Sequence, residues 1–208
     1  MDDDSSPLLR AKAYAQPSVF EPANLLREGR RQRGRPDIAV PEVCLLDPDG
    51  DIVRHLTATG RATEHLGWAC YHTTLWTFDL AGTEIGVIGC AVGAPFAVLL
   101  AEQLAVSGCE LLISVTSSGS ITRVAEPPYF VIIDRALRDE GTSHHYLPPG
   151  RWSDAPSHLV RRLEEGRFGE GRRTDRIDRR YRRSTPAAYK AEEASIEARR
   201  EPIAPPVR

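Results

Sequence analysis

Polar residues directly follow three apolar runs of the chain, at residues 47–51, 89–94 and 116–120. In a parallel α/β sheet, ligands bind at the carboxyl ends of the strands, so we expect these segments to face one crevice. The segment Thr116-Ser117-Ser118-Gly119-Ser120 is the most informative, because its hydroxyl and main-chain N–H groups can donate to a sugar or an anion. A plain turn built from the same residues needs no ligand, and the composition alone does not decide between the two interpretations.

Two other polar clusters are weaker candidates for a site. The spacing of Gly89 and Gly93 matches neither the dinucleotide motif nor the Walker motif, so close helix–strand packing is its simplest interpretation. Residues 138–145 end in His144 and His145, but adjacent histidines do not readily face one metal ion, and no carboxylate at ligand spacing accompanies them. We therefore expect no metal site and no cofactor.

A βαβ unit is expected to position the three polar segments. Its elements are a strand at residues 84–90, a buried helix at 95–106 and a strand at 110–115, and a separate buried strand is expected at 43–46. Pro95 is suited to the first helical position and Gly108 to the residue after the last turn. The other expected elements are a helix at 21–30, a helix or loop at 51–57, a strand within 68–80 in a hairpin with 84–90, a strand at 129–134 and an amphipathic helix at 154–165.

Composition excludes several classes of protein. The chain has 208 residues, 41% of them hydrophobic, which fits one globular α/β domain. Its 27 Lys and Arg nearly balance 29 Asp and Glu, so overall charge gives no attraction to nucleic acid or to a membrane. Gly93 and Pro95 interrupt the apolar stretch 85–115, which argues against a membrane span. The four cysteines are not spaced as CxxC and are interpreted as buried, reduced thiols of a cytoplasmic protein.

The chain divides into three parts by composition. Residues 1–40 are predicted to be an irregular N-terminal arm, residues 41–165 an α/β domain, and residues 166–208 an arginine-rich, poorly ordered tail. The basic run at residues 30–36 is interpreted as a solvated loop, with an arm that contacts an anion as the alternative. No aromatic platform accompanies the arginines of residues 172–183, so nucleic-acid binding is not expected.

The order of these motifs resembles that of the nucleoside phosphorylase family. The stretch GVIGCAVGAPFAVLLAEQLAVSGCELLISVTSSGSI resembles the family's strand, Gly-Gly-Pro turn, helix and Gly-Thr-Thr-Gly-Ala-Ile segment. The stretch ALRDEGTSHHYLPP resembles the family's Arg-x-Asp-Gly-x-Ser-x-His-Phe-x-Pro segment, and Asp47-Pro48-Asp49 resembles its Gly-Asp-Pro turn. The resemblance covers about the middle half of the chain.

The resemblance implies a three-layer phosphorylase-type α/β sandwich around a twisted mixed sheet, with a nucleoside substrate held at the strand ends. It implies that Ser117 approaches the sugar or the nucleophile, and that Ser118 and Gly119 line the base pocket. It further implies that Gly93 lets the backbone approach the ligand and that Arg138 belongs to the substrate-binding set. Family members form dimers and hexamers, so a homo-oligomer is expected, and the apolar stretch 68–80 is its predicted interface.

Three arginines with which the family holds phosphate are absent at the matching positions. Ser114, Tyr71 and the pair Gly50-Asp51 stand in their places, with Arg54 nearby. The family's activity implies cleavage of an N-glycosidic bond, with phosphate as the default co-substrate. The alternatives are attack by water, oriented by Asp49 or Asp51, and a non-catalytic member that binds a nucleoside or only assembles.

Overall fold

The computed structural model of the chain describes residues 12–119 and 130–165, and its centre is a five-stranded sheet in the order β2-β3-β4-β1-β5. The strands β1 (Val43–Asp47), β4 (Thr83–Gly89) and β5 (Leu111–Ser114) are parallel. In the register, Leu46 of β1 lies between Ile88 of β4 and Ser114 of β5, so the carboxyl ends of the three strands meet at one edge of the sheet. The predicted βαβ unit is therefore confirmed, with β1 between its two strands.

The sheet is mixed because β3 (Trp76–Leu80) runs antiparallel to β4. The two strands form the predicted hairpin, and its turn residues Ala81 and Gly82 have φ values of 53° and 83°. Two successive residues with positive φ suit the tight turns that match strand twist. The short strand β2 (Thr63–Glu64) extends the sheet beyond β3 and was not predicted. Residues 68–75, expected to belong to a strand, form a loop instead.

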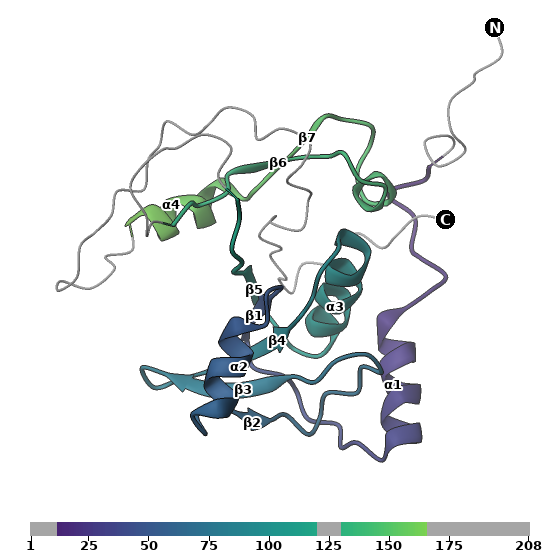
Figure 1. Cartoon of the computed structure of the whole chain (residues 1–208). Coiled ribbons are helices and arrows are strands. Elements are labelled where there is room, and N and C mark those ends of the chain that lie inside the picture. The colour runs from purple at the N-terminus through teal and green to yellow at the C-terminus, as the bar shows by residue number, and fades with distance from the viewer. Residues whose placement is uncertain (1–11, 120–129, 166–208) are drawn as a thin grey trace, which may run out of the picture.

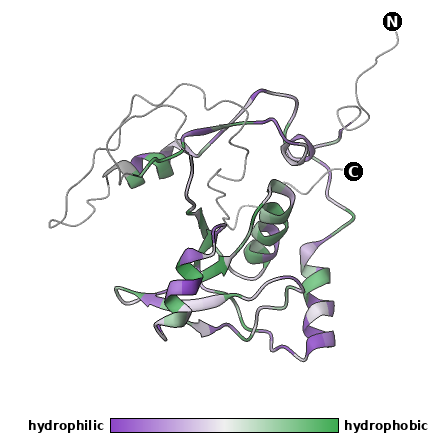
Figure 2. Ribbon diagram, viewed as in Figure 1, coloured by the Kyte–Doolittle hydropathy of each residue, from purple (hydrophilic) through white to green (hydrophobic). Residues whose placement is uncertain are grey.

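Helices cover both faces of the sheet, which makes three layers (Figure 1). On one face, α3 (Ala94–Val106) places Leu100 and Leu104 in a buried cluster with Leu46 and Leu112. On the other face, α2 (Asp51–Ala58) packs Leu56 against a second cluster on β3 and β4. Figure 2 shows α3 as hydrophobic around most of its surface, as a helix that is covered on several sides requires. The expected α/β sandwich around a mixed sheet is thus confirmed.

The N-terminal region contains a longer helix than the sequence indicated. Helix α1 (Pro22–Arg33) buries Leu26 and packs beside α3. Gly29 lies so close to the backbone of Ala69 that an added methyl group would be 2.7 Å from the carbonyl oxygen. The interpretation of residues 30–36 as a loop was wrong, because Arg30–Arg33 form the last turn of α1 and Gly34 ends it with φ 62°. Basic residues stabilise that end of a helix through its dipole.

A smaller unit follows the sheet in the chain. It consists of β6 (Arg135–Leu137), the 3₁₀-helix η2 (Thr142–His145), β7 (Trp152–Asp154) and α4 (Ser157–Glu165). The expected strand at 129–134 is displaced, because the described residues 130–134 form no strand and pairing with β7 begins at Arg135. The helix expected from residue 154 begins at Ser157. The tail at 166–208 lies outside the described residues, so its predicted disorder stays a prediction.

One hydrogen bond joins this smaller unit to α3. The Tyr146 hydroxyl after η2 donates to Glu102 Oε1 at 2.8 Å, and Glu102 is buried. Burial raises the pKa of Glu102 above its ordinary value of 4.5, although the bond from Tyr146 acts in the opposite direction. Protonation of Glu102 is therefore more favourable in the folded state than in the unfolded chain.

We expect Glu102→Gln to change how stability depends on pH. A raised carboxyl pKa contributes stability below the unfolded-state pKa, and that contribution is lost as pH rises through the folded-state pKa. The free energy of unfolding of the variant relative to the parent chain should therefore increase from pH 4 to pH 7, as measured by urea denaturation. A constant difference across this range would contradict the expected burial of the charge.

The stretch 68–80, the predicted oligomer interface, contributes several of its apolar residues to the core of the chain. Trp68, Leu75 and Phe78 are all buried in the core, with exposed fractions of 2%, 0% and 8%. Other residues of the stretch, among them Tyr71 and Leu80, are exposed, so the interface at residues 68–80 stays a prediction. The homo-oligomer itself stays a prediction.

Candidate functional site at the strand ends

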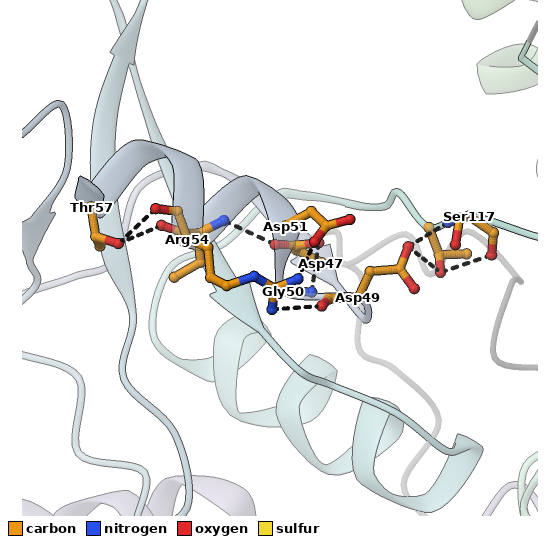
Figure 3. Close-up of polar contacts among 9 residues, drawn as sticks. Asp47, Asp49, Gly50, Asp51, Arg54, Thr57 and Ser117 are labelled. Atoms are coloured by element: carbon orange, nitrogen blue, oxygen red, sulfur yellow. Dashed lines mark hydrogen bonds and ion pairs between the residues drawn. The ribbon is translucent and has the colours of Figure 1, made fainter. Parts of the chain in front are cut away.

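Asp47 organises the edge where the parallel strands end. Its side chain is 1% exposed and accepts hydrogen bonds from the main-chain N–H of Gly50 at 3.1 Å and of Val53 at 3.0 Å. Its carbonyl oxygen accepts from the N–H of Cys90, just after β4, at 2.8 Å. Asp47 thus fixes the start of α2 against the end of β4. Figure 3 shows its side chain beneath the turn.

Asp49 and Ser117, both predicted site residues, lie together. Asp49 Oδ2 accepts hydrogen bonds from the Ser117 main-chain N–H at 2.5 Å and from the Thr116 hydroxyl at 3.2 Å (Figure 3). The N–H of Ser117 holds the pKa of Asp49 below its ordinary value of 3.8. Asp49 is consequently ionised at neutral pH. The predicted convergence of the segments after β1 and β5 is present in the structure.

Asp51 lies on the first turn of α2 and points to Arg54 rather than to Ser117. The Arg54 Nη2 group donates to Asp51 Oδ1, and Nη1 donates to the carbonyl oxygen of Asp49 at 3.1 Å (Figure 3). Both side chains of this pair are exposed, at 64% for Arg54 and 74% for Asp51. An ion pair so exposed contributes little to stability, and its partners can exchange with solvent or a ligand.

A pocket of about 260 Å³ lies beside these residues. Its lining comes from the first turn of α2, the end of β4, the loop before β3 and the start of α3, and includes Arg54, His72, Trp76 and Cys90. Cys90 is exposed, contrary to the expectation that all four cysteines are buried, whereas the other three are buried. Its φ of 61° is uncommon for a residue with a side chain and turns the thiol into the pocket.

Gly50 makes room for two side chains of this pocket. A methyl group added at Gly50 would lie 2.8 Å from Cys90 Sγ and 3.0 Å from Arg54 Nη1. The guanidinium of Arg54 therefore lies close to Gly50. Neither His72 nor Cys90 was singled out by the sequence, because their approach to Gly50 depends on the pairing of β1 with β4.

Three more residues were predicted to bind the substrate, namely Gly93, Ser118 and Gly119, and none of them lines the pocket beside Arg54. Gly93 precedes α3 with φ 97°, which favours glycine there, while Ser118 and Gly119 are exposed after β5 and do not line the pocket. No ligand contact is present to test their roles, so these assignments stay predictions.

Arg138 belongs to the smaller unit, where its guanidinium stabilises a loop. Arg138 is buried and donates to the carbonyl oxygens of Ser143, Leu147 and Pro148 at 2.9, 3.0 and 2.7 Å, and to Ser143 Oγ at 3.0 Å. A guanidinium carries five N–H donors in a rigid planar arrangement, which allows Arg138 to bind several carbonyl oxygens of one loop. The structure therefore accounts for Arg138 by folding of the loop, and the expected substrate contact has no support from its geometry.

The described residues were also compared with the requirements of a metal site and of a membrane-spanning helix. Within residues 12–119 and 130–165, no three His, Cys, Asp or Glu side chains are grouped so that they could hold a metal ion. None of the helices in this described part is long and apolar enough to cross a membrane.

The three-layer architecture, with polar turns gathered at the ends of parallel strands, is the arrangement in which α/β proteins typically bind their ligands. A family model described as the phosphorylase superfamily matches residues 43–190. The chain therefore belongs to the phosphorylase superfamily.

Solved structures with the same fold include two nucleoside phosphorylases. Uridine phosphorylase from Vibrio fischeri is 21% identical with a TM-score of 0.51, and the match covers 61% of this chain and 52% of that one. Purine nucleoside phosphorylase from Toxoplasma gondii, solved in complex with immucillin-H, is 19% identical with a TM-score of 0.52, covering 61% and 51%. The chain thus spans about half the length of these structures. No curated protein sequence matches it significantly.

Proposed function

We propose that the protein cleaves the N-glycosidic bond of a nucleoside at the edge formed by β1, β4 and β5. Membership of the phosphorylase superfamily supports this class of substrate. The observation that carries the proposal is the contact between Asp49 and the turn after β5, which places an ionised carboxylate beside hydroxyl groups. Thr116 and Ser117 would face the hydroxyl groups of the sugar, and Asp49 would face the nucleophile.

Water is the nucleophile that the charges at this edge of the sheet favour over phosphate. Of the described residues that line the pocket, Arg54 is the one with a permanent positive charge, and it is bonded to Asp51. Asp47, Asp49 and Asp51 bring three carboxyl groups to the same turn, which disfavours binding of a phosphate dianion. The Ser117 N–H, which could otherwise donate to an anion, already binds Asp49.

In the proposed reaction, Asp49 accepts a hydrogen bond from a water molecule that attacks the anomeric carbon. The C–N bond breaks, the base leaves with the bonding electron pair and takes a proton, and the water oxygen becomes the hydroxyl of the free sugar. A carboxylate that is held ionised favours this role, because it orients the water and stabilises the positive charge that develops on the sugar.

Base release from uridine and inosine, measured by chromatography with and without inorganic phosphate, tests this proposal. We expect release at the same rate in both conditions, with free ribose as the second product. Release that requires phosphate and yields ribose 1-phosphate would show phosphorolysis, the family default. Absence of release in both conditions, from protein whose fold is verified by circular dichroism, would favour a member that binds without catalysis.

A further inference from the structure

The two-stranded ribbon of β6 and β7 carries an aromatic side chain beside cationic ones. The strands are antiparallel, and Arg135 lies opposite Asp154. Trp152 lies opposite Leu137, two residues further along β6. Because residues opposite each other and residues two apart on one strand point to the same face, Arg135 and Trp152 share a face of the ribbon. The ribbon lies apart from the five-stranded sheet (Figure 1).

Two guanidinium groups lie over the indole ring of Trp152. The Cζ atoms of Arg135 and Arg151 are each 5.5 Å from the ring centroid, within the range of a cation–π interaction. The tryptophan is partly exposed, and the side chain of Arg135 is 45% exposed. The ribbon therefore presents two positive charges beside one aromatic surface.

The acidic residue on this face holds Arg135 only weakly. Asp154 Oδ1 is 3.9 Å from Arg135 Nε, which is too long for a hydrogen bond, and the side chain of Asp154 is 75% exposed. An exposed ion pair of this kind contributes little to stability. A phosphate group that approaches the ribbon can therefore replace Asp154 as the partner of Arg135.

A phosphate chain with unpaired bases has the chemistry that matches this surface. Guanidinium groups bind phosphate oxygens through paired N–H donors, and every base has a flat face that stacks on an aromatic ring or on a guanidinium plane. An acidic peptide would satisfy the charges but would leave the ring without a stacking partner. A duplex keeps its bases stacked on one another, so a single strand is the polyanion that offers both groups.

The sequence adds positive charge soon after the ribbon. Helix α4 follows β7 and carries the exposed Arg161 and Arg162, and residues 172–183 then contain seven arginines. The sequence by itself indicated no aromatic platform near those arginines, and nucleic-acid binding was therefore not expected. The packing of Arg135 and Arg151 on Trp152 removes the ground for that expectation.

We infer that the β6–β7 ribbon is a binding surface for single-stranded nucleic acid, with a base stacked at Trp152 and phosphates bound by Arg135 and Arg151. Stacking and phosphate contacts are open to every nucleotide, so binding should tolerate any sequence. The surface is formed by other residues than the edge at β1, β4 and β5, and the inference does not depend on the proposed function.

Fluorescence anisotropy of labelled oligothymidylate, titrated with the full-length chain, tests the inference. An abasic strand of the same length is the matched probe, because it has the same charge and no bases. We expect the abasic strand to bind about tenfold more weakly or worse, which corresponds to the loss of one stacked base. Equal affinity for the two strands, or tighter binding to a duplex of the same length, would overturn the inference.

Variants at Trp152 locate the binding on the ribbon, because all of them keep the arginines of residues 172–183. Trp152→Leu retains an apolar side chain without a ring and should weaken binding about tenfold, whereas Trp152→Phe retains a ring and should weaken it less than about threefold. The bound strand should quench tryptophan fluorescence in the parent chain and not in Trp152→Phe. Unchanged affinity of Trp152→Leu, with its fold verified by circular dichroism, or equal quenching in Trp152→Phe would contradict stacking at this residue.

Replacement of both arginines separates the phosphate contacts from stacking. Each phosphate contact to a single strand contributes about 0.7 to the slope of log affinity against log salt concentration, so Arg135→Gln combined with Arg151→Gln should reduce the slope by about 1.4. Arg27→Gln combined with Arg31→Gln is the control, because it removes two arginines of α1 that are 67% and 69% exposed. We expect the control to change affinity less than about threefold, since salt screens distant charges. Equal losses for the two double variants would show attraction by overall charge and would overturn the inference.

Discussion

Asp49→Asn should reduce base release by about 100-fold or more, within the range known for loss of a general base. The amide keeps an oxygen that can accept from the Ser117 N–H, at the position where Asp49 Oδ2 now accepts at 2.5 Å. It removes the negative charge that orients water and stabilises the cationic sugar. Initial rates with inosine, together with the melting temperature of the variant, measure this effect and separate it from unfolding.

Asp51→Asn is the matched control for Asp49. Asp51 is bonded to Arg54 and does not contact Ser117, so its substitution should change the rate less than threefold. The pH profile gives an independent measurement, because the lowered pKa of Asp49 keeps it ionised at pH values below those for an ordinary aspartate. Activity should accordingly persist as pH falls through the range in which an ordinary aspartate becomes protonated. Equal rates for the Asp49→Asn variant and the parent chain would eliminate Asp49 as the oriented base.

Asp47→Ala should destabilise the fold by about 2–3 kcal/mol, by loss of a buried cap and of its hydrogen bonds. The Asp47 carboxylate is buried and accepts from the N–H groups of Gly50 and Val53 at the start of α2. In the variant, the Val53 N–H loses its partner and α2 loses its attachment to the sheet. Urea denaturation, followed by circular dichroism, gives the change in the free energy of unfolding.

Asp79→Ala is the corresponding control at the surface. Asp79 Oδ1 accepts from the Gly82 N–H at 3.1 Å, a bond of the same kind, but in an exposed hairpin turn. We expect a loss below about 1 kcal/mol, because water can replace an exposed acceptor. Losses of similar size for the two variants would contradict the role of Asp47 as a buried cap.

The parts of the fold that could be predicted from the sequence are those with a local pattern. The apolar runs at residues 84–90 and 110–115, with Pro95 and Gly108 at the ends of the helix between them, were sufficient to predict the βαβ unit. The hairpin was also predictable, because Ala81-Gly82 separates two runs of strand-forming residues. Polar residues after parallel strands led correctly to the contact between Asp49 and Ser117.

The parts that could not be predicted depend on neighbours that are distant in sequence. The apolar composition around Leu75 suits an exposed surface as well as a core, and only the contacts of Leu75 with the buried cluster on the sheet and α3 show that it belongs to the core. Arg138 follows a strand as a binding arginine would, yet its partners are carbonyl oxygens of residues 143–148. Cys90 was expected to be buried, because a strand pattern does not reveal the positive φ that exposes the thiol.

The place of β1 in the sheet has a consequence for how the chain folds. Val43 pairs with Ile85 on one side and with Leu111 on the other, so β1 comes first in the chain and both strands that pair with it come much later. The nascent β1 cannot satisfy its main-chain groups until the crossover through α3 is complete. Contacts between such distant segments slow folding and leave apolar strands exposed in the meantime. Release of the chain during synthesis before β5 has emerged would therefore leave one side of β1 unpaired, and such a product should aggregate rather than fold.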